Sequence, residues 1–263
     1  MDEAEERTVW DAVWAKTVKD ERGLRGQLSS RFTREAYLCL REFVAAGDRR
    51  MLEAGCGTGR LCCLLAEEFE EAIVVGIDIS KESIRIASRL KGLVCSSDNL
   101  IFGRGDLFSL PFADSCFDIT FGEGVIEHFG ALPGRGYKDA VKEMVRVTKP
   151  GGKVVVAVPN WYCFPHTAYK AVLRMLGRDY EYGYERSFTH RELKALFSGL
   201  GLQNLQLSGW YPAHGFYRLD RYSSFFRLPG KLVDLVQAAS DRLIHGYFSK
   251  MFGFEIMIGG EKA

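Results

Sequence analysis

Residues 52–59 read Leu52-Glu53-Ala54-Gly55-Cys56-Gly57-Thr58-Gly59, and this stretch decides the fold class. An apolar run at Arg50–Ala54 leads into it, and a helical pattern at Thr58–Phe69 follows. Alternating glycines suit a tight strand-to-helix turn where backbone approaches a ligand, because a Cβ atom would be in the way. The stretch therefore predicts a ligand-binding βα unit. A tight turn that binds nothing is the alternative, and three glycines disfavour it.

The rest of the chain alternates short apolar strands with helical segments, which is typical of a parallel sheet with crossover helices. Further strands are expected at Ala72–Ile77, Leu100–Gly103, Phe117–Phe121, Val154–Val158, Leu202–Leu207 and Phe254–Ile258. Helices are expected at Lys81–Leu90, Tyr137–Val147 and Thr189–Leu200, and a turn at Lys149–Gly152. We expect a helical N-terminal segment at residues 1–47 and an α/β domain at 48–263. Insertions at Asn160–Ser187 and Gly209–Gly253 are interpreted as aromatic caps over the substrate side.

The composition of the chain disfavours several classes of protein. The formal net charge of +1 over 263 residues disfavours a nucleic-acid partner, which usually requires a basic face. Seven cysteines, an odd number without zinc-site spacing, indicate free thiols in a reducing cytoplasm and no metal site. The start, MDEAEERTVW, does not resemble a signal peptide, and no apolar run reaches the ~20 residues of a membrane span.

The glycine spacing distinguishes between cofactors. Dinucleotide sites prefer G-x-G-x-x-G, but here the third glycine comes one residue early and Arg60 takes the place of the expected one. The Glu53 carboxylate would repel phosphate but suits an ammonium or a sulfonium-bearing amino acid. Asp78, about twenty residues past the turn, is placed to accept hydrogen bonds from ribose hydroxyls. Its alternative role is a helix N-terminal charge before Ser80.

A second loop, Gly105-Asp106-Leu107, follows the third expected strand at its carboxyl end, where open α/β sheets bind ligands. Asp106 could accept a hydrogen bond from an adenine amino group. Taken alone, the loop is better explained as an ordinary Gly-Asp turn.

Five ordered segments resemble the class I S-adenosylmethionine-dependent methyltransferases, of the small-molecule type with an E-x-G-x-G-x-G turn. The segments are LEAGCGTGR, VVGIDIS, GDLFSLPF, FDITFGEGVIEHF and VTKPGGKVVVAVPN. The resemblance is close over residues 50–160 and loose over 189–207. It implies a Rossmann-like three-layer sandwich, with a seven-stranded, mostly parallel sheet whose last strand is antiparallel. It also implies S-adenosylmethionine as cofactor and S-adenosylhomocysteine as its product.

The same resemblance implies cofactor roles for matching positions. Glu53 and the backbone of Gly55, Cys56 and Gly57 would meet the methionine moiety, and Gly59 would allow close approach. Asp78 would hold the ribose, and Ile79 would flank the adenine. Asp106 and the backbone of Leu107 would contact the adenine edge. Gly122 and Glu123 would lie near the methionine amino group and the transferred methyl.

His128 is the candidate catalytic base, because its intrinsic pKa suits removal of a proton from an oxygen or nitrogen nucleophile. Glu123 and Glu127 are the other polar residues after the fourth expected strand. A helix-start histidine bonded to backbone is an equally good interpretation. The string IEHFG also resembles the cyclopropane fatty-acid synthases, although the rest of that pattern is absent.

We expect in-line methyl transfer to a small, partly apolar or aromatic acceptor, since the caps carry many aromatic residues. A non-catalytic S-adenosylmethionine-binding protein and a lipid-directed or RNA-directed methyltransferase remain alternatives. Phe121-Gly122-Glu123-Gly124 stands where an RNA enzyme would carry Asn-Pro-Pro-Tyr. A nicotinamide oxidoreductase is disfavoured by the glycine spacing. Arginines beside the second cap's aromatics leave peripheral membrane contact open, and the oligomeric state is not determined.

Overall fold

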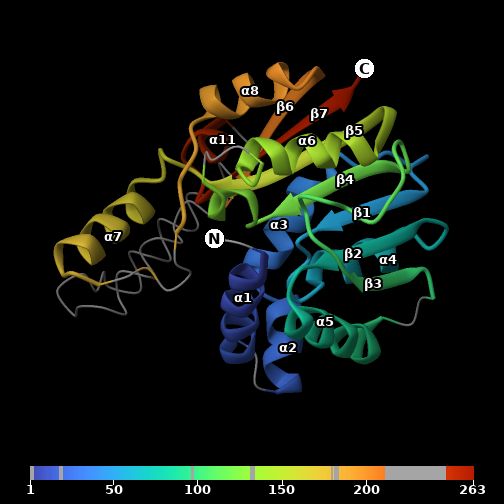
Figure 1. Ribbon diagram of the computed structural model, residues 1–263, viewed down its shortest axis with the longest axis horizontal. Coiled ribbons are helices and arrows are strands. Elements are labelled where there is room, and N and C mark those ends of the chain that lie inside the picture. Colours follow the sequence, from blue (N-terminus) through green and yellow to red (C-terminus); the bar gives the residue numbers. More distant parts are fainter. Residues whose placement is uncertain are drawn as a thin grey trace.

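The computed structural model describes residues 3–17, 20–95, 98–130, 134–178, 180, 184–210 and 247–263. A seven-stranded sheet runs through the centre of the molecule (Figure 1). Its strands are β1 Arg50–Ala54, β2 Ile73–Asp78, β3 Leu100–Arg104, β4 Phe117–Glu123, β5 Thr148–Pro159, β6 Leu202–Trp210 and β7 Glu255–Lys262. They are ordered β3-β2-β1-β4-β5-β7-β6.

The pairing of β7 is antiparallel to both β5 and β6, whereas β1 to β5 pair in parallel. This confirms the predicted Rossmann-like sheet with a reversed last strand. The strand order changes direction between β1 and β4, the topological switch point at which open α/β sheets bind ligands.

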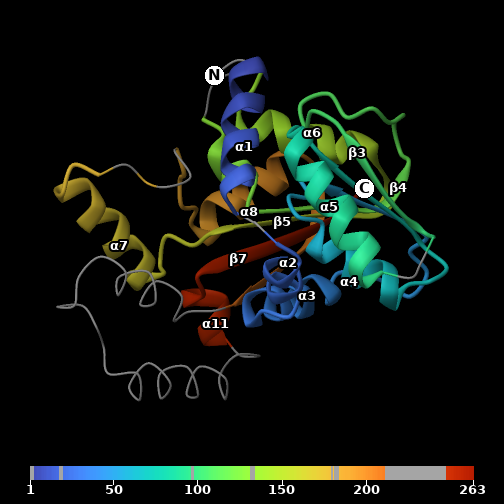
Figure 2. The same ribbon diagram turned by 90° about the horizontal axis from the view of Figure 1, so that it is seen from below.

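Helices lie on both faces of the sheet and complete three layers (Figures 1 and 2). They are α1 Glu3–Thr17, α2 Glu21–Leu28, α3 Arg31–Arg41, α4 Arg60–Glu68, α5 Lys81–Val94, η1 Ile126–His128, α6 Tyr137–Val147, α7 Phe164–Met175, α8 His190–Gly199 and α11 Tyr247–Phe252. Successive strand residues point to opposite faces, so Met51 packs with α3, α4 and α5 whereas Leu52 packs with α6 and α8.

N-capping side chains fix the starts of two helices. Ser80 Oγ accepts a hydrogen bond of 3.1 Å from the Ser83 N–H and begins α5. Thr189 and Glu192 form a capping box at the start of α8, with reciprocal hydrogen bonds between side chain and backbone. Because α5 starts directly after β2, its cap also fixes the position of Asp78.

The turn predicted at Lys149–Gly152 is wrong, because β5 begins at Thr148 and continues through these residues. Gly151, with φ +75°, lets the strand pass through a left-handed position, and the β4–β5 register shifts between Phe117 and Ile119. Local turn signals are therefore overridden by strand pairing.

The N-terminal segment shares the main core. Ala36 and Leu40 of α3 pack in the same cluster as sheet residues such as Val155. Figure 1 shows α1 and α2 beside α5, at the edge of the sheet where β1 and β2 end.

The first insertion leaves the sheet after β5 and forms α7, which stands away from the body in both views (Figures 1 and 2). Asn160 Nδ2 ties its start to the backbone before β7, donating to the carbonyls of Met251 and Gly253 at 2.9 and 3.1 Å. Of the second insertion, residues 211–246 lie outside the described residues. None of the described helices is long and apolar enough to cross a membrane.

Candidate functional site

A cavity of about 750 Å³ opens at the carboxyl ends of the parallel strands. The glycine turn after β1 and the end of β2 form one side, and the residues after β4 and before β7 form the other. Its size falls within the range of ~300–1,000 Å³ typical of pockets for small ligands and cofactors. The cavity therefore lies at the switch point of the sheet.

The structure brings nine of the eleven predicted cofactor residues to this cavity. They are Glu53, Gly55, Cys56, Gly57, Asp78, Ile79, Asp106, Leu107 and Glu123. Gly59 and Gly122 lie outside its lining. A Cβ atom on Gly59 would come within 2.4 Å of Phe102 Cζ, so this glycine is required for packing the turn against β3.

Hydrogen bonds within the protein hold the glycine turn. The N–H groups of Gly55 and Cys56 both donate to the Ile77 carbonyl at 2.8 Å. The Gly57 N–H donates to Asp78 Oδ2 at 2.9 Å. These donors are already engaged, so the turn is not a free cradle of N–H groups for a pyrophosphate. This geometry disfavours a dinucleotide.

Asp78 has two partners in the turn region, since its other oxygen accepts a hydrogen bond of 2.9 Å from the Ser80 N–H. Burial raises the pKa of Asp78 above its ordinary value, although both backbone hydrogen bonds act to lower it. Asp78 also lines the cavity. It therefore combines the helix-start role and the cavity position that the sequence left as alternatives.

Glu53 and Arg60 face the cavity where β1 ends and α4 begins. The Cys62 thiol donates to Glu53 Oε2 at 2.9 Å, and burial raises the pKa of Glu53 to about 8. Arg60 forms a short ion pair with Glu123, while its buried Nη1 has no hydrogen-bond partner within the described part of the chain. One carboxyl and one guanidinium nitrogen thus lie in the lining of the same cavity, where they could accept from the ammonium and donate to the carboxylate of an amino acid.

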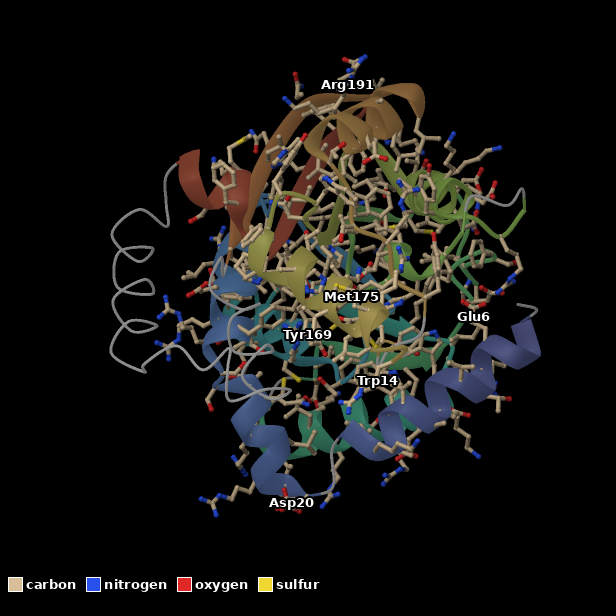
Figure 3. The ribbon with its side chains drawn as sticks, turned by 90° about the vertical axis from the view of Figure 1, so that its left-hand side faces the viewer. Glu6, Trp14, Asp20, Tyr169, Met175 and Arg191 are labelled. Atoms are coloured by element: carbon tan, nitrogen blue, oxygen red, sulfur yellow. The ribbon has the colours of Figure 1, made fainter. Side chains whose placement is uncertain are left out.

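The wall contributed by α1 was missed by the sequence analysis. Trp10 and Trp14 line the cavity, and Trp14 Cη2 would lie 2.9 Å from a Cβ atom on Gly57. In Figure 3, Trp14 lies on the side of α1 that faces the body of the molecule. The spacing of the two tryptophans, one helical turn apart, was the available signal.

Arg135 connects this helix to the second predicted loop. It donates to Asp106 at 2.8 Å and to Glu6 of α1 at 2.5 Å, and its guanidinium lies 4.3 Å from the centre of the Phe108 ring. Asp106 also accepts from the Phe108 N–H at 3.0 Å. Arg135 therefore links the Gly105–Leu107 loop to α1.

His128 lines the cavity at the end of η1. Its Nδ1 lies 2.8 Å from the Tyr184 carbonyl, which can only accept, so Nδ1 carries the proton and Nε2 is left basic. The ring packs edge-on against Trp10, with centroids 4.8 Å apart. Burial lowers the pKa of His128, although the Tyr184 contact acts to raise it, so the ring is neutral near pH 7.

Three further carboxyls with buried side chains line the cavity: Glu127, Glu185 and Glu255. Burial raises the pKa of Glu185, but the hydrogen bond from His166 and the charge of Lys170 bring it down to about 2. Burial and neighbouring carboxylates hold the pKa values of Glu127 and Glu255 well above their ordinary range. Glu185 and Glu255 were not singled out from the sequence, since nothing near them in the chain marks a site.

The aromatic residues of the first expected cap divide between wall, core and surface. Tyr180 lines the cavity, as does Phe254 just before β7. Tyr169 is buried, and Trp161, Tyr162, Phe164 and Tyr184 are exposed. Figure 3 shows Tyr169 on α7. Tyr182, His214 and the second cap's other aromatics between 211 and 246 lie outside the described residues. Within the described ranges no group of three or more His, Cys, Asp or Glu side chains is arranged to hold a metal ion.

Comparison with known proteins adds sequence and fold relationships. A family described as "Methyltransferase domain" matches residues 52–156. Demethylmenaquinone methyltransferase of Bacillus licheniformis is 34% identical over 173 residues, covering 59% of this chain and 71% of that protein. Ajmaline N-methyltransferase of Rauvolfia serpentina is 30% identical over 122 residues, which are 45% of this chain and only 40% of that protein.

Solved structures agree on the fold. Geranyl diphosphate C-methyltransferase from Streptomyces coelicolor superposes with a TM-score of 0.63 at 14% identity, covering 99% of this chain and 98% of that one. At this identity the likeness concerns the fold alone. The sequence match to the Bacillus enzyme, extending over more than two thirds of it, decides the family. Taken with the sheet and its glycine turn, the match shows that this chain belongs to the class I S-adenosylmethionine-dependent methyltransferases.

Proposed function

We propose that this chain transfers the methyl group of S-adenosylmethionine to a small, partly apolar or aromatic acceptor by in-line displacement. The single observation that carries the proposal is the continuity of the cavity. It runs from the glycine turn and Asp78 to a wall that includes Tyr180 and Phe254, so both reactants would share one enclosure.

The residues present fit the cofactor. Glu53 and the carbonyl oxygens of the glycine turn would accept hydrogen bonds from the methionine ammonium. The N–H groups of the turn would take no part, since they already donate within the protein. The unpartnered Nη1 of Arg60 is a donor for the methionine carboxylate. Asp78 retains acceptor capacity for ribose hydroxyls.

At the opposite side of the cofactor site, Ile79 and the Leu107 backbone would flank the adenine, and Asp106 would accept from its amino group. Arg135 and the Phe108 N–H hold the Asp106 carboxylate in place. Gly59 and Gly122 would act through packing, since neither lines the cavity.

When bound, S-adenosylmethionine supplies a methyl group already activated on a sulfonium. The task of the chain is then to align the nucleophile with the methyl carbon and to exclude water. Trp10 and Trp14 form a wall over the site and provide aromatic faces that favour a cation. His128 Nε2 would accept the proton of the nucleophile, with Nδ1 held by the Tyr184 carbonyl.

The acceptor class draws on the relatives as well as on the cavity wall. Their names record small organic acceptors, demethylmenaquinone for the bacterial enzyme and ajmaline chemistry at nitrogen for the plant enzyme. Aromatic residues on the acceptor side suit an acceptor with an apolar body.

Calorimetry with S-adenosylhomocysteine and transfer of a labelled methyl group to a panel of small aromatic acceptors test the proposal. We expect cofactor affinity near micromolar, about 8 kcal/mol. Tight NADH binding without S-adenosylmethionine binding would overturn the proposal. Cofactor binding with no transfer to any small molecule would favour a non-catalytic binding protein.

A further inference from the structure

Two of the carboxyls that line the cavity are buried and belong to different elements. Glu127 belongs to η1 after β4 and is 2% exposed; Glu255 begins β7 and is 4% exposed. Both line the cavity. The free-energy cost of burying these carboxyls is only partly offset, because the Oε2 atom of each has no hydrogen-bond partner among the described residues.

Two other carboxylates of the cavity wall form ion pairs, whereas Glu127 and Glu255 do not pair with a lysine or arginine among the described residues. Glu123 pairs with Arg60, and Glu185 pairs with Lys170 at 2.7 Å and His166 at 3.1 Å. In the described part of the chain, neither Glu127 nor Glu255 forms an ion pair with a lysine or arginine. Among the described residues, the basic atom near Glu127 is His128 Nε2, which lies 3.9 Å from Glu127 Oε1.

Two unpaired carboxyls in one enclosure strongly favour a cation as their ligand. Ionising both in an empty, desolvated cavity is unfavourable, so the free protein keeps protons on them. An ammonium ion supplies a positive charge and several N–H donors for the two vacant oxygens. A carboxylate, a phosphate or a neutral hydroxyl carries no positive charge, so none of them could compensate for ionisation of the two acids.

We propose that Glu127 and Glu255 form the acceptor subsite for an amine, bound as its ammonium ion, with Tyr180 and Phe254 packing against its apolar body. The inference rests on the proposed function, since it names the substrate class of the same cavity. It commits the chain to methylation at nitrogen.

The reaction at this subsite balances as follows. The ammonium first gives one N–H proton to His128 Nε2, which is basic because Nδ1 donates to Tyr184. The freed nitrogen lone pair forms a bond to the methyl carbon as the carbon–sulfur bond breaks, and that bond's electron pair stays on sulfur. The product is an N-methylated ammonium, and the proton on His128 leaves to solvent.

Binding should also displace protons from the acids. The charged groups acting on Glu127 and Glu255 are Arg60 of α4, Glu123 of β4, Lys170 of α7 and Glu185. His128 and His166 complete the titratable set at this end. Entry of an ammonium therefore favours the ionised form of the two carboxyls, so we expect binding to be accompanied by proton release.

Calorimetry on the full chain with saturating S-adenosylhomocysteine provides the test. The probes are 2-phenylethylamine, its neutral isostere 2-phenylethanol and the anionic 3-phenylpropanoate. We expect the amine to bind at least about tenfold more tightly than the alcohol and the carboxylate not to bind. Comparing Tris with phosphate buffer, whose ionisation heats differ, measures proton release.

The variants Glu127→Gln and Glu255→Gln should each reduce the preference for the amine, and the double variant should abolish both the preference and the proton release. Glutamine replaces a neutral acid by a neutral amide, so the fold should persist. The matched control is Glu70→Gln, an exposed carboxyl between α4 and β2 at the opposite edge of the sheet, which should keep both properties.

Several results would overturn the inference: equal or absent binding of amine and alcohol, preference for the carboxylate, or a preference that survives in the double variant. Mg²⁺ binding that the double variant loses, without amine binding, would assign the acids to a metal instead. Failure of the proposed function is separate, because it would appear already as absent S-adenosylhomocysteine binding in the unsubstituted chain.

Discussion

Asp78 Oδ2 accepts a hydrogen bond of 2.9 Å from the backbone N–H of Gly57, so the carboxylate at the end of β2 fixes the turn at the end of β1. The second oxygen binds the Ser80 N–H at the start of α5. One side chain therefore orders two loops that border the cavity, besides facing the proposed ribose position. Its removal should affect both cofactor affinity and stability.

For Asp78→Ala we expect S-adenosylhomocysteine binding to weaken at least about tenfold, because ribose hydroxyls lose a charged acceptor. Two backbone N–H groups also lose their partner, at about 1–3 kcal/mol each. Calorimetry measures the first effect and thermal unfolding the second. The control is Asp98→Ala at an exposed position before β3, which should change neither. An unchanged dissociation constant in folded Asp78→Ala would remove this residue from the site.

Gly57 is expected to tolerate no side chain. Its φ is +51°, and an added Cβ atom would lie 2.9 Å from Trp14 Cη2. Gly57→Val should abolish cofactor binding, and Gly57→Ala should weaken it. Adding Trp14→Ala to Gly57→Ala relieves the contact but leaves the backbone strain, so we expect only partial recovery in calorimetry.

The matched control for that series is Gly92→Ala on α5, where nothing lies within 4 Å of the new Cβ atom. In a helix this change should stabilise the protein by about 0.5–1 kcal/mol and leave binding intact. If Gly57→Val binds the cofactor normally, the glycine turn is only a structural connection.

Much of the fold could be predicted because its signals are local. Buried parallel strands are apolar runs between turns, and both β1 and α6 were placed at their observed bounds, Arg50–Ala54 and Tyr137–Val147. The start of β5 was missed because Lys149–Gly152 has the composition of a turn. Pairing with β4, where Thr148 faces Phe117, overrides that composition.

The site could be predicted only where its residues follow a strand end in sequence, as Glu53 and Asp78 do. Glu255 reaches the same cavity because β7 runs antiparallel, which brings the start of this strand to the edge where the others end. The α1 wall is docked by contacts between residues far apart in the chain, Glu6 with Arg135 and Asp11 with Ser80. Such long-range contacts leave no periodic pattern.

We expect the buried carboxyl of Glu53 to make the stability of the cofactor-free protein depend on pH. Burial raises its pKa from 4.5 to about 8, so between these values the folded state keeps a proton that the unfolded chain has lost. The free energy of unfolding should therefore fall as pH rises through this window, by up to about 1.4 kcal/mol per pH unit for this proton. Chemical denaturation of the unsubstituted chain and Glu53→Gln at several pH values isolates the contribution.

The expected result is that Glu53→Gln gains stability relative to the unsubstituted chain with each step from pH 5 to pH 8. Glu127 and Glu255 change in the same direction but are common to both proteins, so the difference reports Glu53 alone. Parallel pH profiles would show that Glu53 ionises in the folded state as it does in the unfolded chain. Exposed Glu70→Gln should run parallel to the unsubstituted chain.

We expect Arg135 to transmit the ordering effect of cofactor binding to α1. The guanidinium bridges Asp106, at the proposed adenine position, and Glu6 of α1. Ordering the loop should therefore slow amide hydrogen exchange in residues 3–17 as well as in 50–107. If the first insertion acts as a lid, with Tyr180 and Glu185 in the cavity wall, exchange in α7 should slow as well.

Arg135→Gln separates these effects. The cofactor should still protect the glycine turn, which Asp78 holds independently. Protection of α1 should decrease because the bridge to Glu6 is gone, while the contacts of Asp11 with Ser80 and Glu82 remain. The control is Arg85→Gln, an exposed arginine on α5 that pairs only locally with Glu82, and it should keep the full pattern. Protection confined to 50–107 in the unsubstituted chain would make α1 and α7 static walls. Loss of all protection in Arg135→Gln would instead show that the turn depends on Arg135, either through Asp106 or through Trp14 of α1, which lies against Gly57.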